Sequence, residues 1–255
     1  MTDSYSQSDE LGEIVWHEFD SQRALAVELA NELISRFRAI LDQGQRPLAA
    51  FSGGSTPKPL FEELSTQEFD WSQAQMTLVD ERWVEPTHEL SNHRFITEHF
   101  LSHLVRQPEF IPLYAKAKTV EDSMSLIQEF FDVATKSRSN AEAFFDAVVL
   151  GMGGDGHTAS FFPDAKNVSE LVAYSSEVSL QTCISAASQV DRITWSLAKL
   201  LSTPYLVLHI TGQQKRDLFN RAIENSTASF EDLRTLPIRS VAYQSRTPLH
   251  VFYAD

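Results

Sequence analysis

Hydrophobic residues recur at intervals of three or four positions early in the chain, between residues 20 and 44. The positions that carry them are Leu25, Leu29, Leu33, Phe37 and Ile40. This spacing places the side chains on one face of an α-helix. An Asp and a Ser begin the segment and Gly44 ends it, and these residue types are common at helix ends. The pattern predicts one amphipathic helix over residues 20–44.

Short apolar runs follow, and each gives way to a turn rich in glycine or in charged residues. The runs occupy residues 48–51, 76–79, 145–150 and 205–210. Their length and abrupt ends predict buried strands. Helical patterns lie between them over residues 60–64 and 119–134, and the second opens with a Thr-x-x-Asp cap. A final apolar run over residues 249–252 predicts a last strand, which we expect at an edge of the sheet.

Strands that alternate with helices predict an α/β fold, in which helices cover both faces of a mainly parallel sheet. In open sheets of this kind, ligands bind beyond the carboxyl ends of the strands. The chemically rich turns of this sequence follow such strand ends, so we expect the functional site there. The length of 255 residues fits one large domain, and we expect residues 1–255 to form it.

The chain is acidic, with a formal net charge of −14 at pH 7 and no run of Lys or Arg. We therefore expect no nucleic acid and no membrane among its partners, because an acidic surface repels both. The sequence has no apolar stretch long enough to span a bilayer, and its first ten residues lack the features of a signal peptide. The single cysteine, Cys183, cannot form an intramolecular disulfide. Together these features predict a cytoplasmic protein.

The turn after the first apolar run has the composition of a phosphate-binding loop. Two glycines let the backbone approach a ligand, three side chains offer hydroxyls, and the helix that follows would attract an anion with its N-terminal amides. The candidate phosphate ligands are Ser52, Gly53, Gly54, Ser55 and Thr56. The turn lacks the Gly-Lys-Ser/Thr ending of a nucleotide P-loop. The alternative is a turn whose glycines serve geometry alone.

A second turn, residues 151–157, combines glycines with residues suited to acid–base chemistry. Its sequence Gly-Met-Gly-Gly-Asp-Gly-His frees the backbone to display Asp155 and His157 at a strand end. Histidine titrates near neutrality, so it can take a proton from water and return it to a leaving oxygen. A nearby carboxylate would fix its tautomer. We expect His157 to be the catalytic base, with Asp155 or Asp80 as its partner.

Basic residues near the other turns are candidates for binding negative charge. In the Asp-Glu-Arg triplet of residues 80–82, the alternation of an extended chain places Asp80 and Arg82 on one face. Arg82 could bind phosphate or stabilise an oxyanion, and a local salt-bridged turn is the alternative. Lys215, near the start of a predicted helix, and Arg192 are further phosphate candidates. Taken singly, each of these two is more often a solvated surface charge.

Metal and nucleophilic chemistry have weaker support in the sequence. His99 and His103 stand four apart on a predicted helix, but the residues between them supply no further ligand, so we expect no metal. There is no Gly-x-Ser-x-Gly elbow of a serine hydrolase. Cys183 lies outside the candidate turns, which favours a packing role over a nucleophilic one.

Three longer motifs occur in order along the chain: Ser-Gly-Gly-Ser-Thr-Pro, Asp-Glu-Arg-Trp-Val with Ser91-Asn92 beyond it, and Gly-Met-Gly-Gly-Asp-Gly-His-Thr-Ala-Ser-Phe-Phe-Pro. With Arg-Ile-Thr, Thr-Gly-x-x-Lys and Leu-Pro-Ile, they cover the chain from Ala50 to Val241. In this order they closely resemble the motifs of the 6-phosphogluconolactonase family, which belongs to the glucosamine-6-phosphate isomerase/deaminase superfamily.

The resemblance implies a Rossmann-like fold and the hydrolysis of 6-phosphogluconolactone in the pentose phosphate pathway, without a metal or an organic cofactor. It also implies that His157 is the base, that the turn of residues 52–56 surrounds the phosphate together with Arg192 and Lys215, and that Arg82 lies near the reacting end. The expected partner is thus a small phosphorylated lactone. We expect the chain to be a monomer or a weak homodimer.

Two other functions deserve comparison with the lactonase interpretation. Glucosamine-6-phosphate deaminases resemble the chain in several motifs, but their pattern has Tyr where Arg82 stands and Glu where Phe162 stands. Phenylalanine cannot transfer the proton that a deaminase needs. A noncatalytic sugar-phosphate sensor of a transcription regulator would carry a DNA-binding module, for which the acidic chain has neither the charge nor the room before its first strand. The sequence favours the lactonase.

Overall fold

The computed structural model describes residues 10–138, 143–185 and 190–255. Residues 1–9, which form most of the acidic start that argues against a signal peptide, lie outside these ranges. Among the described residues, no helix combines the length and the apolar character that crossing a membrane requires.

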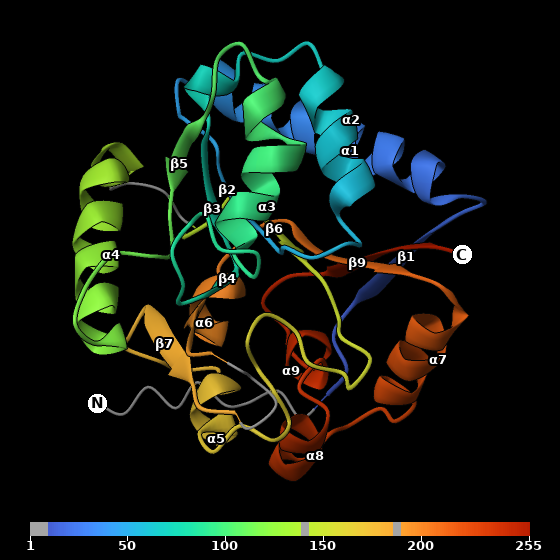
Figure 1. Ribbon diagram of the computed structural model, residues 1–255. Helices are drawn as coiled ribbons and strands as arrows, with labels where there is room; N and C mark the ends of the chain where they lie inside the picture. The colour runs from blue at the N-terminus through green and yellow to red at the C-terminus, as the bar shows by residue number, and fades with distance from the viewer. Residues whose placement is uncertain (1–9, 139–142, 186–189) are drawn as a thin grey trace.

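A seven-stranded sheet forms the centre of the molecule (Figure 1). Each strand runs parallel to its neighbours. In spatial order the strands are β1 (Ile14–Phe19), β10 (Leu249–Ala254), β9 (Leu206–Thr211), β6 (Ala147–Leu150), β2 (Leu48–Phe51), β3 (Gln75–Leu78) and β5 (Glu109–Ile111). All residues of β2, β3 and β6 are buried, as expected for strands with helices on both faces. The predicted parallel α/β fold is confirmed.

The position of the last strand corrects the sequence analysis. β10 lies inside the sheet, between β1 and β9, and not at an edge. The edge strand on that side is β1, whose residues are mostly half-buried, and β5 forms the other edge. The sequence Ile-Val-Trp-His-Glu-Phe mixes polar with apolar residues, so a search for uniformly apolar runs passes over it. The misplacement follows because no apolar run of the sequence analysis covers residues 14–19, which leaves the last strand without an outer neighbour.

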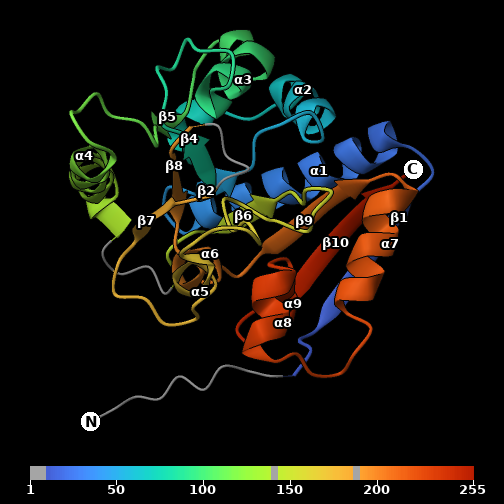
Figure 2. The ribbon, with the colours of Figure 1, turned by 60° about the horizontal axis from the view of Figure 1, so that its bottom comes forward.

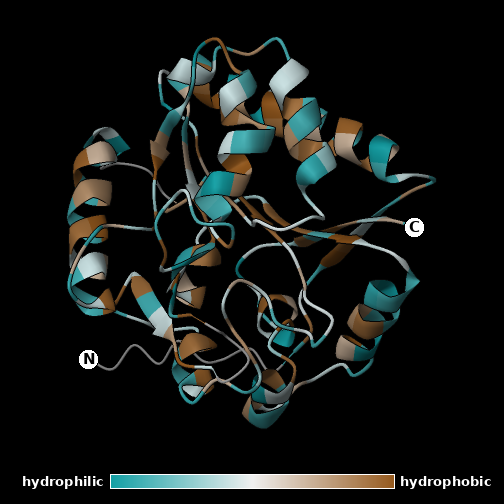
Figure 3. Cartoon of the chain, viewed as in Figure 1, coloured by the Kyte–Doolittle hydropathy of each residue, from teal (hydrophilic) through white to brown (hydrophobic). Residues whose placement is uncertain are grey.

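Helices cover both faces of the sheet, and Figure 2 shows α1 behind it with α7 to α9 in front. The α-helices are α1 (Gln22–Asp42), α2 (Lys58–Thr66), α3 (Asn92–His99), α4 (Val120–Ala134), α5 (Val168–Leu171), α6 (Leu197–Leu200), α7 (Gln213–Ala222), α8 (Phe230–Thr235) and α9 (Arg239–Ala242). Three short 3₁₀ turns are η1 (Trp71–Gln73), η2 (Leu101–His103) and η3 (Lys136–Arg138). The longer helices carry both hydrophilic and hydrophobic residues (Figure 3), as amphipathic helices on a sheet should.

The two helices predicted with capping residues begin as expected. The side chain of Ser21 accepts a hydrogen bond from the Ala24 amide at the start of α1, and Thr119 accepts one from Asp122 at the start of α4. The predicted apolar face of α1 is also confirmed, since Leu25, Leu29, Leu33 and Phe37 are buried. Burial of that face against the sheet stabilises α1 far more than its cap does.

A second, three-stranded sheet was not predicted. It is antiparallel and consists of β4 (Asp80–Arg82), β8 (Arg192–Trp195) and β7 (Leu180–Cys183). Its pairing sets Arg82 opposite Arg192, although the two residues are far apart in the sequence. Cys183 lies at the end of β7, and burial raises the pKa of its thiol to about 11, which fits the predicted packing role. The small sheet therefore presents two predicted site residues on adjacent strands.

The order of the strands identifies where a ligand should bind. From β2 the chain proceeds outward to β3 and β5, then returns to β6 on the other side of β2 and proceeds through β9 to β10. The direction reverses between β2 and β6, so the loops that leave these two strands diverge and open a crevice between them. The loops in question are the two glycine-rich turns.

Candidate active site

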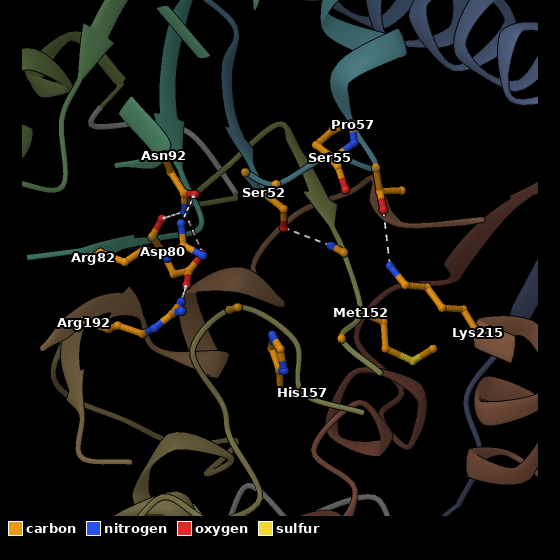
Figure 4. Close-up of a pocket in the computed structure, with 16 residues that line it drawn as sticks. Ser52, Ser55, Pro57, Asp80, Arg82, Asn92, Met152, His157, Arg192 and Lys215 are labelled. Carbon is orange, nitrogen blue, oxygen red and sulfur yellow. Dashed lines mark hydrogen bonds and ion pairs between the residues drawn. The ribbon is translucent and has the colours of Figure 1, made fainter. Parts of the chain in front are cut away.

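A pocket of about 700 Å³, measured with the space at its mouth, lies at this crevice (Figure 4). It is lined by Ser52, Gly53, Gly54, Ser55, Thr56, Pro57, Asp80, Arg82, Asn92, Gly151, Met152, Gly153, His157, Ala159, Arg192 and Lys215. The structure therefore brings together every predicted site residue except Asp155, which does not line the pocket but contacts His157.

The two glycine-rich turns are joined directly to each other. The Ser52 hydroxyl accepts a hydrogen bond from the Gly151 amide at 2.9 Å, and the Ser52 amide donates to the carbonyl of Val149. The Thr158 hydroxyl in turn donates to the Gly151 carbonyl. Ser52 is thus engaged in linking β2 to β6, so of the hydroxyls in its turn those of Ser55 and Thr56 are better placed to serve a ligand.

One end of the pocket offers donors for an anion. Lys215 lies in the first turn of α7, where the sequence analysis expected a helix start, and its Nζ donates to the Thr56 hydroxyl at 3.2 Å. Gly54 adopts a φ of 90°, a conformation that favours glycine, in the turn before α2. The start of α2 adds little, contrary to the sequence analysis, because Pro57 and Pro59 have no N–H and the Lys58 amide donates to the Ser55 carbonyl. The Lys215 ammonium and the Ser55 and Thr56 hydroxyls are a suitable set for a phosphate.

Burial lowers the pKa of two basic residues at this end of the pocket. It lowers the pKa of Lys215 below the ordinary value for lysine. His209 of β9 is fully buried, and its desolvation, with a smaller contribution from Lys215, lowers its pKa to about 3. His209 is therefore neutral at physiological pH, and Lys215 supplies the positive charge there.

The second turn orients His157 through its own backbone and Asp155. The Asp155 carboxylate lies 2.5 Å from Nδ1 of His157 and also accepts a bond from the His157 amide. The hydrogen bond with His157 lowers the pKa of Asp155, so this carboxylate is ionised at neutral pH. Of the two partners left open by the sequence, Asp155 is the one in contact. Its bond with Nδ1 leaves Nε2 as the nitrogen that can act on a ligand.

One glycine of this turn, Gly153, is required by the imidazole itself. A Cβ at Gly153 would lie 2.2 Å from Cε1 of His157 and 2.3 Å from its Nδ1, so any side chain there would displace the ring. Gly156 has a φ of 80°, which favours glycine as well. The sequence analysis assigned these glycines to backbone freedom, and the structure adds close packing as a second reason.

Phe162 packs beside the histidine. Its ring stacks on the imidazole of His157, with 4.2 Å between the centroids, and the Arg192 guanidinium lies over the same ring at 4.9 Å. An aromatic ring in this position fixes the tilt of the imidazole without offering it a proton. The same ring thus contacts both His157 and Arg192.

Asp80 joins the small sheet to the pocket. Its carboxylate accepts a bond from Arg192 Nη1 at 3.1 Å and one from the Ser160 hydroxyl at 2.6 Å. In Figure 4, Asp80, Arg82 and Arg192 lie on one side of His157, and Lys215 and Ser55 lie on the other. Asp80 is therefore engaged with Arg192, while Arg192 approaches the pocket from the side opposite Lys215.

Glu81 points away from the pocket, as alternation along the triplet predicts. It is fully buried, and its two carboxylate oxygens accept four hydrogen bonds. The donors are the amides of Arg82, Asn92 and His93 and the hydroxyl of Ser91. Burial raises the pKa of Glu81, and the four bonds, which favour the ionised form, oppose that rise. This carboxylate fixes the N-terminus of α3 against β4.

Asn92 is a pocket residue that the sequence analysis did not select as a site candidate. It is the first residue of α3, lines the pocket and has only 4% of its surface exposed. Its side chain bonds to Asp80 and Arg82. Ser91-Asn92 belonged to one of the recognised motifs, but a polar residue at a helix start is usually a cap, which hid its second role.

The chain is similar in sequence to known proteins over most of its length. A sequence model described as Glucosamine-6-phosphate isomerases/6-phosphogluconolactonase matches residues 20–249. The 6-phosphogluconolactonase of Rhizobium meliloti (strain 1021) is 35% identical over 238 residues, covering 93% of this chain and 97% of that protein. The 6-phosphogluconolactonase of Neisseria meningitidis serogroup B (strain ATCC BAA-335 / MC58) is 30% identical over 241 residues, covering 94% and 99%.

Solved structures give the same picture of the fold. A 6-phosphogluconolactonase from Shewanella baltica OS155 aligns with a TM-score of 0.83 and 33% sequence identity, covering 96% of this chain and 100% of that one. A monomeric glucosamine-6-phosphate deaminase aligns with a TM-score of 0.70 and 15% identity, covering 93% and 97%. The second match indicates a shared fold and nothing more.

The hydrogen bonds of Glu81 predict a stability defect for Glu81→Gln. The amide would place an NH₂ group against buried donors, and we expect the free energy of unfolding to fall by about 3 kcal/mol. Urea denaturation followed by circular dichroism measures the change. Glu85→Gln is the matched control, because that side chain is exposed and its partners are Lys116 and Tyr114. Equal stability of the two variants would contradict the role given to Glu81.

Proposed function

Because the chain belongs to the family of glucosamine-6-phosphate isomerases and 6-phosphogluconolactonases, we propose that it hydrolyses 6-phospho-D-glucono-1,5-lactone to 6-phosphogluconate. The observation that carries the proposal is the composition of one pocket, in which a carboxylate-oriented histidine occurs together with a lysine and hydroxyl set for phosphate. The names of the relatives give the substrate class, and the pocket of this chain supplies groups suited to the chemistry.

The phosphate binds at the end of the pocket formed by residues 52–56 and Lys215. Lys215 contributes the charge, the Ser55 and Thr56 hydroxyls contribute hydrogen bonds, and the glycines allow the phosphate oxygens to approach the backbone. Arg192 was expected to join this set. Arg192 approaches the pocket from the opposite side, which supports a contact with another part of the substrate, away from the phosphate. Anchoring the phosphate orients the lactone ring.

The lactone carbonyl then lies beside His157. Neutral His157 keeps a proton on Nδ1, which donates to Asp155, and uses the lone pair of Nε2 to accept a proton from water. The water oxygen forms a bond to the carbonyl carbon, and the C=O electron pair moves onto oxygen to give a tetrahedral intermediate. Asp155 stabilises the imidazolium produced in this step, as a carboxylate next to a catalytic histidine does.

Collapse of the intermediate completes the reaction. The carbonyl re-forms, the bond to the ring oxygen breaks, and the imidazolium gives its proton to that oxygen. The negative charge that develops on the carbonyl oxygen is stabilised by Arg82 or by amides of the glycine-rich turn. The histidine returns to its neutral form. Each proton that moves is carried by water, His157 or the sugar, so the cycle requires no metal and no organic cofactor.

Phe162 is the residue that argues most directly against the deaminase alternative. Deamination of an amino sugar requires acid–base groups for ring opening and proton transfer, and the family pattern of deaminases has a glutamate where Phe162 stands. In this chain the position holds a phenyl ring stacked on His157. The ring supports the histidine but cannot exchange a proton. This contact favours lactone hydrolysis.

The experiment that tests the proposal compares two substrates of the superfamily. Purified protein is given freshly prepared 6-phosphogluconolactone, with acid release followed in a pH-stat and the spontaneous rate subtracted, and separately glucosamine 6-phosphate, with ammonia release followed. We expect turnover of the lactone only. Release of ammonia without lactone hydrolysis above background would overturn the proposal.

Replacing the base should slow the chemistry without weakening substrate binding. We expect His157→Ala to lower kcat by about 10²- to 10⁴-fold, the usual contribution of a general base. Affinity for 6-phosphogluconate, measured by calorimetry, should change little. His103→Ala is the control, since that histidine is exposed and its ring bonds to the backbone carbonyl of Glu98 in α3. A kcat near that of the unchanged protein would rule out His157 as the base.

Replacing Lys215 should weaken the binding of the phosphorylated ligand and have less effect on kcat. A charge-assisted hydrogen bond is worth about 1.5–3 kcal/mol, so we expect Lys215→Ala to weaken 6-phosphogluconate binding by about tenfold or more. The exposed Lys116 provides the control variant. A loss confined to kcat, with unchanged affinity, would contradict the phosphate role.

The lowered pKa of Lys215 adds a pH signature to this variant. Binding requires the ammonium, and burial makes it lose its proton at a lower pH than an exposed lysine. Affinity for 6-phosphogluconate should therefore decline as pH rises, and the decline should begin at a lower pH than the titration of an exposed lysine. Lys215→Ala should remove this decline, and an unchanged decline would assign it to another group.

A further inference from the structure

Arg82 has to be held in place against competing forces. It stands opposite Arg192 on the neighbouring strand, and it is partly buried. Burial lowers the pKa of Arg82, with the charge of Arg192 acting in the same direction and that of Asp80 opposing it. Between these opposing charges, the long arginine side chain can adopt several rotamers. A useful position at the reacting end requires a partner that selects one of them.

The contacts of the guanidinium identify that partner. Its Nη1 donates to the carbonyl of Leu90 at 2.7 Å and to Oδ1 of Asn92 at 3.0 Å. Within the part of the chain that the structure describes, neither its Nη2 nor its buried Nε makes a hydrogen bond with the protein. Arg82 therefore uses one nitrogen for attachment and keeps Nη2 for a ligand in the pocket that it lines.

The amide of Asn92 is locked in the orientation that this attachment needs. Its Nδ2 donates to the backbone carbonyl of Asp80 at 3.0 Å. Exchanging the positions of oxygen and nitrogen would set NH₂ against the Arg82 guanidinium and an oxygen against the Asp80 carbonyl, which would lose both bonds. The Asn92 side chain thus hydrogen-bonds to both the backbone of Asp80 and the guanidinium of Arg82.

The backbone of Asn92 is held independently. Its amide donates to the buried carboxylate of Glu81 at 2.8 Å, next to the bonds that Glu81 makes with Ser91 and His93. Glu81 also accepts from the amide of Arg82. The strand residue that carries the guanidinium and the helix residue that positions it are therefore attached to one carboxylate.

The absence of a side chain at Gly53 leaves room for the side-chain amide of Asn92. A Cβ at Gly53 would lie 2.2 Å from Oδ1 of Asn92 and 2.4 Å from its Cγ. By contrast, a Cβ at Gly54 would meet nothing within 4 Å. The first glycine of the phosphate turn is therefore needed for the contact with Asn92, whereas the second is needed for its positive φ.

From these contacts we infer that Asn92 is a positioning residue for the lactonase reaction, which orients Arg82 so that Nη2 faces the substrate at the reacting end. The inference rests on the proposed function and deepens it. Asn92 does not touch the reacting atoms. It acts through Arg82, and its packing against Gly53 fixes the distance between the reacting end and the phosphate turn.

A double-mutant cycle tests whether Asn92 acts through Arg82. We expect Asn92→Ala to lower kcat by about tenfold, within the range of coupling between residues in contact, and to change KM by less than about threefold. In the Arg82→Ala background, the same substitution should change kcat by less than about twofold. Equal losses in the two backgrounds would overturn the inference, because a general structural defect adds to the loss of Arg82.

Two further variants separate positioning from folding. Ser91→Ala removes a neighbouring bond to Glu81 and the cap of α3, but it leaves the Asn92 side chain in place. It should cost stability and retain most of kcat, so a loss of kcat equal to that of Asn92→Ala would contradict the inference. Gly53→Ala pushes on Asn92 from the other side and should lower kcat in the same direction. Unchanged kcat in Gly53→Ala would also count against it.

A crystal structure of Asn92→Ala tests the position of the Arg82 guanidinium without measuring turnover. We expect the Arg82 guanidinium to leave the Leu90 carbonyl and move toward Asp80. An unmoved guanidinium would overturn the inference even if the protein proved inactive on the lactone. Lack of lactone hydrolysis by the unchanged protein, together with a displaced Arg82 in the variant, would instead refute the proposed function alone.

Discussion

The parallel pairing of β2 with β6 is the constraint on which the site depends. These strands are neighbours in the sheet although about a hundred residues separate them, and the chain leaves them toward opposite sides. Their following turns are bonded to each other through the Ser52 hydroxyl and the Gly151 amide. The phosphate turn and the histidine turn are thereby fixed on either side of one opening. Without this pairing, the same residues would be two unrelated loops.

Charge is distributed unevenly in a way that suits an anionic substrate. The chain has a net charge of −14, yet the pocket is lined by Arg82, Arg192 and Lys215. Asp80 neutralises part of this charge through Arg192, and Asp155 lies against His157. The acidic remainder of the surface repels other polyanions, while the local field at the pocket attracts a small phosphorylated molecule.

The sequence predicts those parts of the molecule that short-range patterns determine. Apolar runs revealed the central strands, capping residues located the starts of α1 and α4, and the glycine-rich turns led to Lys215, His157 and the phosphate loop. Pairing between distant segments was not accessible in this way. The small antiparallel sheet, the inner place of β10 and the contact between Asp80 and Arg192 all depend on which strands meet. Asn92 was missed for the same reason, since its partners are defined only once α3 packs on β4.

The ion pair between Asp80 and Arg192 joins positions 112 residues apart. Closing so long a loop carries an entropic cost that the folded structure must offset. The pairing of β1 with β10 closes a longer loop, from Ile14 to Leu249, so the large sheet and the small sheet both depend on contacts between distant parts of the chain. Recovery of activity during refolding would therefore report the assembly of both sheets, which the formation of single helices does not require.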